Sequence, residues 1–112
     1  MSFDPDRFEE EKYAAYFTEL QTAYKRAFET MNERFDSGLV HAIDQRVLAE
    51  SEPFYDDGGF RVELPDDPDP GERVAEAGVV VESEKLDAVL DRYVEELEAE
   101  LADRFLDDGP KA

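Results

Sequence analysis

The sequence contains no cysteine and only one histidine. Without cysteine, disulfides, thiol chemistry and cysteine-ligated zinc or iron–sulfur sites are excluded. No apolar run reaches the 18 or so residues that a membrane span needs. The N-terminal stretch MSFDPDRFEEE also lacks the basic and apolar parts of a signal peptide. We therefore expect a cytoplasmic protein that does not enter a membrane, and we expect no cofactor.

Basic side chains are scarce, since 12 Lys and Arg stand against 31 Asp and Glu, for a formal net charge of -19. The basic residues form no cluster, and phosphate contacts need clustered Lys and Arg, so nucleic acid is disfavoured as a partner. Many carboxylates, few lysines and no cysteine together fit a salt-accumulating cytoplasm, where a charged surface stays hydrated and salt screens its self-repulsion. The alternative is that the acidic surface acts as a decoy that binds a basic partner.

The apolar content is sufficient for a packed core. Hydrophobic residues make up 41% of the 112 residues and aromatic residues 12%, which is too rich for a disordered chain despite the charge. This length is usual for one domain, so we predict a single domain over residues 1–112.

The N-terminal third predicts one long amphipathic helix. Asp4 and Pro5 suit its cap and first position, and Ser37 with Gly38 suits its end, Gly38 being expected in the left-handed conformation. Apolar residues recur between them at steps of three and four. The candidate packing and dimer stripe of this helix comprises Tyr13, Phe17, Leu20, Tyr24, Phe28 and Met31.

Residues 39–51 have two interpretations. Val40, Ile43 and Val47 have helical spacing, which favours a helix, whereas a strand requires polar residues such as His41 on its apolar face. Pro53 is expected to end either element.

A β-hairpin is predicted next, because residues 54–55 and 60–64 flank the turn DDGG and the second run alternates apolar and charged residues. A short helical turn over 72–77, stopped by Gly78, follows a proline-rich loop. The β-branched run Val79 to Val81 predicts a buried third strand.

The C-terminal residues predict a second long helix. Ser83 suits its cap, an apolar stripe runs from Leu86 to Phe105, and Gly109-Pro110 suits its end. The predicted fold is therefore α+β, with long N-terminal and C-terminal helices packed on a small antiparallel sheet made of the hairpin and the third strand.

The length of the first helix predicts a homodimer. About 30 helical residues span roughly 45 Å, whereas a globule of this size is about 35 Å across. Both ends of the apolar stripe then need cover that one chain does not supply, so the N-terminal helices are expected to meet in a dimer interface.

The proline-rich loop PDDPDPGE, residues 65–72, does not fit a calcium site. Counted from Asp67, loop position 5 is Gly71, position 6 is Glu72 and position 12 is Gly78, where a calcium loop needs a ligand, a glycine and a glutamate. The prolines indicate a stiff, solvated connection.

His41 and Asp44 lie three residues apart and share a face if their segment is helical. With Glu50 or a second chain they provide a thin metal or acid–base site. The favoured interpretation is a packed histidine bonded to Asp44 or to backbone. The aromatic residues of the first helix could similarly line a ligand groove, although packing is favoured.

The stretches GLVHAIDQRVLAESEPFY and AGVVVESEKLDAVLDRYVEELE resemble a family of small uncharacterised acidic proteins of halophilic archaea, a domain of unknown function. The resemblance covers nearly the whole chain and implies no activity. If these stretches are its hallmarks, a shared polar cluster comprises His41, Asp44, Glu50, Glu52 and Tyr55. We predict a non-enzymatic, homodimeric protein-interaction module with an unidentified protein partner. The alternative is a small-molecule or metal-dependent activity at His41 and Asp44.

Overall fold

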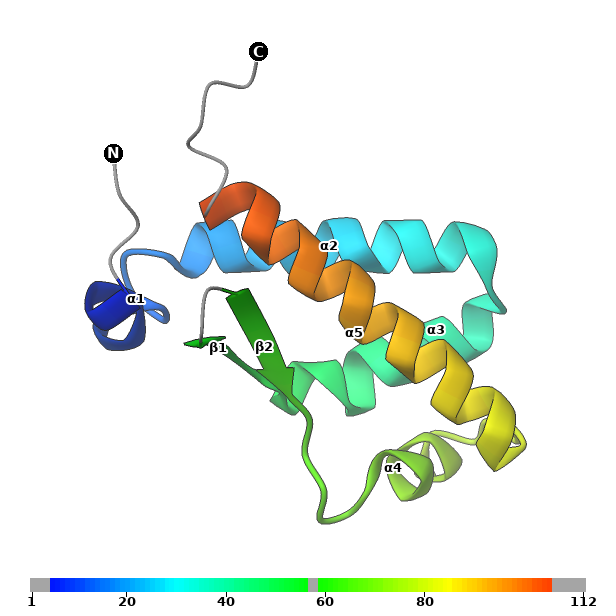
Figure 1. The fold of residues 1–112 in the computed structure, drawn as a ribbon. Coiled ribbons are helices and arrows are strands. Elements are labelled where there is room, and N and C mark those ends of the chain that lie inside the picture. The colour runs from blue at the N-terminus through cyan, green and yellow to red at the C-terminus, as the bar shows by residue number, and fades with distance from the viewer. Residues whose placement is uncertain (1–4, 57–58, 106–112) are drawn as a thin grey trace.

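The structure is a computed structural model and describes residues 5–56 and 59–105. It is α+β, with helices around one two-stranded antiparallel sheet (Figure 1). Its elements in chain order are α1 (Pro5–Glu11), α2 (Phe17–Arg34), α3 (Ser37–Arg46), the 3-10 helix η1 (Leu48–Glu50), β1 (Glu52–Asp56), β2 (Gly59–Glu63), α4 (Pro70–Glu76) and α5 (Ser83–Phe105). Within these residues, none of the helices has the length and apolar character that crossing a membrane requires.

Helix α5 is the centre of the packing, because it contacts both α2 and β2 (Figure 1). Its side chain Tyr93 is fully buried, and the small residues Ala23 and Ala27 of α2 are buried as well, which lets the two helices approach closely. The predicted apolar periodicity of α5 is confirmed. Its buried residues are Leu86, Val89, Leu90, Tyr93, Leu97 and Leu101.

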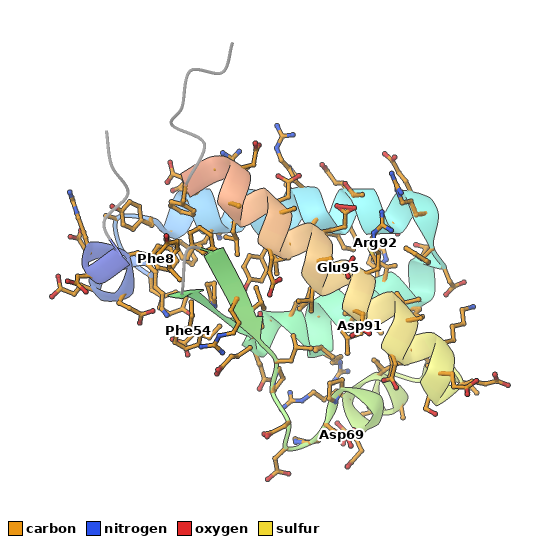
Figure 2. The ribbon with its side chains drawn as sticks, in the orientation of Figure 1. Phe8, Phe54, Asp69, Asp91, Arg92 and Glu95 are labelled. Atoms are coloured by element: carbon orange, nitrogen blue, oxygen red, sulfur yellow. The ribbon has the colours of Figure 1, made fainter. Side chains whose placement is uncertain are left out.

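An aromatic cluster closes the end of the fold where α1, the hairpin and the C-terminal part of α5 meet. Phe8, labelled in Figure 2, is fully buried at its centre. Its ring centroid lies 5.3 Å from that of Phe60 and 5.4 Å from that of Phe105, both edge to face, and 6.0 Å from that of Tyr16. Such ring pairs add to the burial of their surface.

The single long N-terminal helix was a wrong prediction, because residues 12–16 form a turn between α1 and α2. In this turn the amide of Tyr16 donates to the carbonyl of Glu11 at 3.1 Å. The break lets Phe8 face the hairpin while the stripe of α2 faces α5. Helix α2 has 18 residues, roughly 27 Å, and the described part of the chain extends 46 × 31 × 23 Å. The length of the helix therefore does not require a dimer, and the dimer itself stays a prediction.

Helix α2 also ends earlier than predicted. It stops at Arg34, and Asp36 caps α3 by accepting a hydrogen bond from the amide of Leu39 at 2.9 Å. Gly38 therefore lies in the first turn of α3 rather than in a left-handed cap; among the described glycines only Gly78 has a positive φ. The helical interpretation of residues 39–46 is confirmed.

The hairpin is confirmed, with Tyr55 opposite Phe60 and Pro53 opposite Val62. Pro53 lies inside β1 rather than ending the preceding element, which a two-stranded sheet tolerates because each strand is an edge. The amide of Val62 donates to a carboxylate oxygen of Glu98 on α5 at 3.0 Å. This bond ties the sheet to α5.

The proline-rich loop leads into α4 and is anchored by Arg73, a buried arginine. Its guanidinium donates to the carbonyls of Pro68 at 2.6 Å and Arg46 at 3.3 Å, and it pairs with Glu50 at 3.0 Å. Asp69 caps α4 by accepting from the amide of Glu72 at 2.8 Å. The loop is therefore a fixed connection, and its Asp69 carboxylate caps a helix.

The third strand was a wrong prediction. Gly78, at φ 88°, ends α4, with its amide donating to Ala75 and the amide of Val79 donating to Val74, the pattern of a Schellman motif. Val80 is 100% exposed. Residues 79–82 only join α4 to α5, at the end of the fold away from the hairpin (Figure 1), so no strand edge is within their reach.

Three predicted features lie outside the described residues: the cap at Asp4, the centre of the hairpin turn at residues 57–58, and the stop at residues 109–110.

The cap at Asp69 gives a test of the loop. Asp69→Ala is expected to lower the free energy of unfolding by about 1 kcal/mol, because the amide of Glu72 loses its acceptor. The exposed Asp66 caps no helix, so Asp66→Ala should change it by less than about 0.5 kcal/mol. Denaturant unfolding with calcium and with chelator should give the same two differences; a loss confined to calcium would restore the ion-site interpretation.

Candidate functional site

A groove of about 770 Å³ runs along α2, between that helix and the segment from the end of α3 to the start of β1. Its lining is mainly apolar and aromatic, which is the usual character of a ligand or peptide site. Tyr13 and Phe17 stand at its lip and are 56% and 45% exposed. Tyr24 and Phe28 are half-buried along its wall, and Leu20 is buried beneath them.

The stripe predicted for the N-terminal helix, of which Tyr13 lies in the turn before α2 and the rest on α2, is thus divided between two environments. Leu20 and Met31 are buried in the core, and Leu20 also lines the groove. The partly exposed members of the stripe line the groove as well: Tyr13, Phe17, Tyr24 and Phe28. Helical spacing alone did not separate them, because the part of the stripe that is covered depends on where α3 and β1 fold.

The floor of the groove holds a hydrogen-bonded hydroxyl pair. Ser51 donates to the carbonyl of Leu48 at 2.7 Å, so Tyr24 donates to the Ser51 hydroxyl at 2.9 Å. Burial raises the pKa of Tyr24 to about 12. The phenol is therefore neutral at ordinary pH and joins α2 to the turn before β1.

Asp44 of α3 also lines the groove and is half-buried. It accepts a long hydrogen bond from the hydroxyl of Tyr93, at 3.4 Å. Burial raises the pKa of Asp44, while the bond from Tyr93 and the nearby His41 act in the opposite direction. Burial also raises the pKa of Tyr93, which keeps that hydroxyl protonated as the donor.

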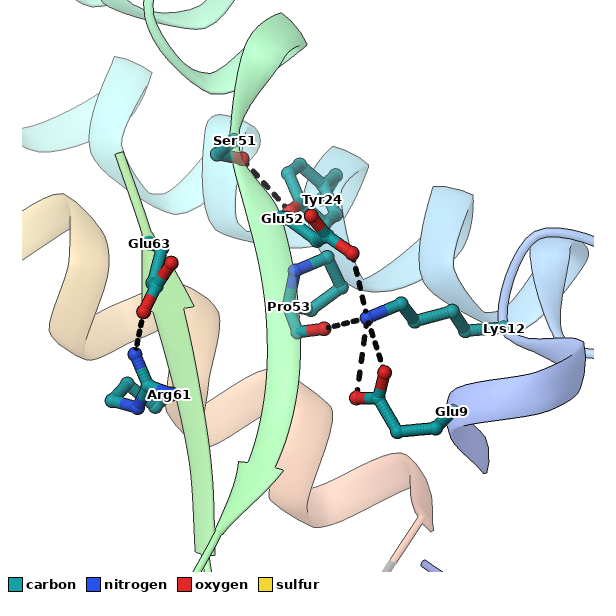
Figure 3. Close-up of polar contacts among 8 residues, drawn as sticks. All are labelled: Glu9, Lys12, Tyr24, Ser51, Glu52, Pro53, Arg61 and Glu63. Carbon is teal, nitrogen blue, oxygen red and sulfur yellow. Dashed lines mark hydrogen bonds and ion pairs between the residues drawn. The ribbon is translucent and has the colours of Figure 1, made fainter. Parts of the chain in front are cut away.

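Lys12 makes a group of polar contacts between α1 and β1, beside the groove-lining Pro53 (Figure 3). Its side chain is only 3% exposed, and its ammonium group lies 2.9 Å from Glu52, 3.3 Å from Glu9 and 2.9 Å from the carbonyl of Pro53. It also lies 4.1 Å from the ring centroid of Phe54, a cation–π contact. One cation thus joins α1, the following turn and β1.

The contacts of Lys12 with Glu9, Glu52 and Pro53, here called the Lys12 clasp, position part of the groove lining directly. Tyr13 follows Lys12 in the chain, Pro53 accepts the lysine's hydrogen bond, and both line the groove. Burial raises the pKa of Tyr13, and the nearby carboxylate of Glu52 adds to the effect. The role of Lys12 was missed at the level of sequence, since nothing in the local pattern distinguishes a buried lysine from a surface one.

The five residues of the predicted polar cluster are not brought together. His41 is exposed, its Nδ1 donates to the carbonyl of Ser37 at 2.9 Å, and its ring packs edge to face on Phe28 at 4.9 Å. Glu50 pairs with Arg73, Glu52 pairs with Lys12, and Tyr55 packs on Phe60. Asp44 alone of the five lies in the groove.

The part of the chain that the structure describes contains no group of three or more His, Asp or Glu side chains placed to hold a metal ion. His41 and Asp44 share α3 but have separate hydrogen-bond partners. The arrangement offers an aromatic contact surface together with hydrogen-bonding groups at Tyr24, Ser51 and Asp44.

The fold and the groove together define a small α+β domain with an open aromatic surface. The chain belongs to DUF5783, a family of unknown function, whose sequence model matches residues 1–107. No curated protein and no solved structure matched the chain in comparisons of its sequence and fold. Membership of a family of unknown function is as expected from the sequence, and its halophilic origin stays a prediction.

The contribution of the Lys12 clasp to stability can be tested by Lys12→Met, which keeps the apolar part of the side chain and removes the charge. Pro53 then loses its donor and the two carboxylates lose their shared cation, so the free energy of unfolding should fall by about 2 kcal/mol. Lys85→Met, on the exposed face of α5, is the matched control and should change it by less than about 0.5 kcal/mol. Equal effects of the two substitutions in denaturant unfolding at molar salt would contradict a structural role for Lys12.

Proposed function

We propose that the protein is a non-enzymatic interaction module that acts as a homodimer, with the groove along α2 as its contact surface. The observation that carries the proposal is the exposure of Tyr13 and Phe17 at the lip of the groove. Two large exposed aromatic side chains stand beside a half-buried aromatic wall in a groove whose lining is more apolar than polar, and exposed apolar surface of this kind marks interaction sites. Aromatic residues are also the side chains most enriched among those that dominate binding energy.

The distribution of charge supports the same surface. Helix α2 carries Glu19, Glu29 and Glu33 against Lys25, Arg26 and Arg34, and is therefore formally neutral. Helix α5 has eight carboxylates, at positions 84, 87, 91, 95, 96, 98, 100 and 103, against three basic residues at 85, 92 and 104. Two chains of charge -19 repel each other least where their neutral faces meet.

We further propose that the module works in a salt-rich cytoplasm. The support is the excess of 31 acidic over 12 basic residues, spread over most of the helices, as on the outer face of α5 around Asp91 and Glu95 (Figure 2). At about 1 M salt the Debye length falls to about 3 Å, so that two such chains can approach. An apolar contact gains strength under the same conditions if the salt is strongly hydrated.

The test is the mass of the particle in solution at molar salt, measured by light scattering over a range of protein concentration. The wild type is expected at twice 12.8 kDa, and Phe17→Ser is expected to raise the dimer dissociation constant by about tenfold or more, because a central aromatic contact is lost. Val80→Ser removes a fully exposed apolar side chain outside the groove and should leave the dimer unchanged.

A wild-type chain that stays at 12.8 kDa at every concentration would exclude the dimer. Equal weakening by Phe17→Ser and Val80→Ser would exclude the groove as its interface.

A further inference from the structure

The groove carries one charge of each sign. Among the described residues that line it, Lys25 and Asp44 are the charged ones. Lys25 projects from α2 and is exposed, and Asp44 projects from α3 on the other wall and is half-buried. Neither has an ion-pair partner among the described residues, although the carboxylate of Asp44 accepts the long bond from Tyr93.

We propose that the groove is complementary to itself, so that Lys25 of one copy pairs with Asp44 of a second copy and Asp44 of the first with Lys25 of the second. This inference rests on the proposed homodimer and specifies its geometry. A two-fold axis along the groove exchanges its two walls, and the cation on the α2 wall then meets the anion on the α3 wall of the other copy. A two-fold interface requires this kind of self-complementarity, because the same patch is used twice.

The charge pattern favours a second copy over an unrelated partner. A strongly basic protein would be attracted to the carboxylates of α5 more than to a groove whose lining is neutral overall. An acidic protein without a matching groove would leave Lys25 or Asp44 without a counterion. A second copy brings one charge of each sign in the required places.

The aromatic lip makes such a pair effective. Tyr13 and Phe17 are partly exposed at the edge of the groove. When a second copy covers these two side chains, they exclude water from the groove. Charges shielded from water interact more strongly than charges on an open surface. The pairs would therefore set the register of the two copies, while the aromatic side chains would supply most of the contact area.

The experiment uses two charge reversals, Lys25→Asp and Asp44→Lys, and measures dimer dissociation constants by sedimentation. It is run at the lowest salt at which circular dichroism shows each chain folded, so that screening is least. Each variant alone is expected to dimerise at least about tenfold more weakly, because both inter-chain pairs become like-charged. Mixed in equal amounts, the two variants should form a heterodimer within about threefold of the wild-type dissociation constant, since both pairs are then restored.

Lys85→Asp is the matched control, because it makes the same change of charge on α5 outside the groove; its dimer should stay within about threefold of wild type. Weak variants with a restored mixture support the inference. A wild-type dimer whose affinity is unchanged by Lys25→Asp, a substitution at an exposed residue, overturns the inference and leaves the proposed dimer intact. A mixture that binds no better than the separate variants overturns it in the same way. A wild type that is monomeric throughout overturns the proposed function itself.

Discussion

Lys12 is the point on which the N-terminal half of the fold depends. Its ammonium group is buried between Glu9 on α1 and Glu52 on β1, and it donates to the carbonyl of Pro53. A buried ammonium group loses its hydration, so it needs hydrogen-bonding and charged partners that replace the lost water. Pro53 lies 41 residues from Lys12 in the chain, so satisfying this one charge holds the first helix and the turn after it against the hairpin. Lys12 meets these partners from the turn that breaks the N-terminal helix.

The groove follows from the same arrangement. With the turn held against β1, the aromatic stripe of α2 is covered by α5 on one side and left open beside Tyr13 and Phe17 on the other. The open side lies on the one long helix whose formal charge is zero. An acidic surface that keeps the chain hydrated and a neutral aromatic face that permits contact therefore occupy different elements. This separation is the physical basis of the proposed interaction module, because a contact face with the average charge of the chain would repel its own copy.

The sequence was sufficient for the elements whose signals are local. The alternation in residues 60–64 predicted β2, the stripe of α5 predicted its buried face, and Gly78 predicted the end of α4.

The sequence was insufficient where contacts between residues distant in the chain determine the structure. Helical periodicity continues across residues 12–16, so the break there gives no local signal. Asp36, Ser37 and Gly38 suit the end of a helix as well as its start. The three valines at 79–81 form no strand because they lie away from the strands of the hairpin. The aromatic spacing favours packing over a ligand groove, since spacing does not reveal which side of a stripe is covered.

The distance between the α2 helices of two copies is the most direct test of the groove as a contact surface. Because the chain has no cysteine, Arg26→Cys introduces a single spin-label site on an exposed part of α2 that does not line the groove. If the groove held in place by Lys12 is the contact surface, pulsed electron paramagnetic resonance at molar salt should give one defined inter-chain distance shorter than the 46 Å length of the described part of the chain. The absence of an inter-chain dipolar signal at any protein concentration would contradict the groove as the contact surface. Only inter-chain distances above 46 Å would contradict it as well.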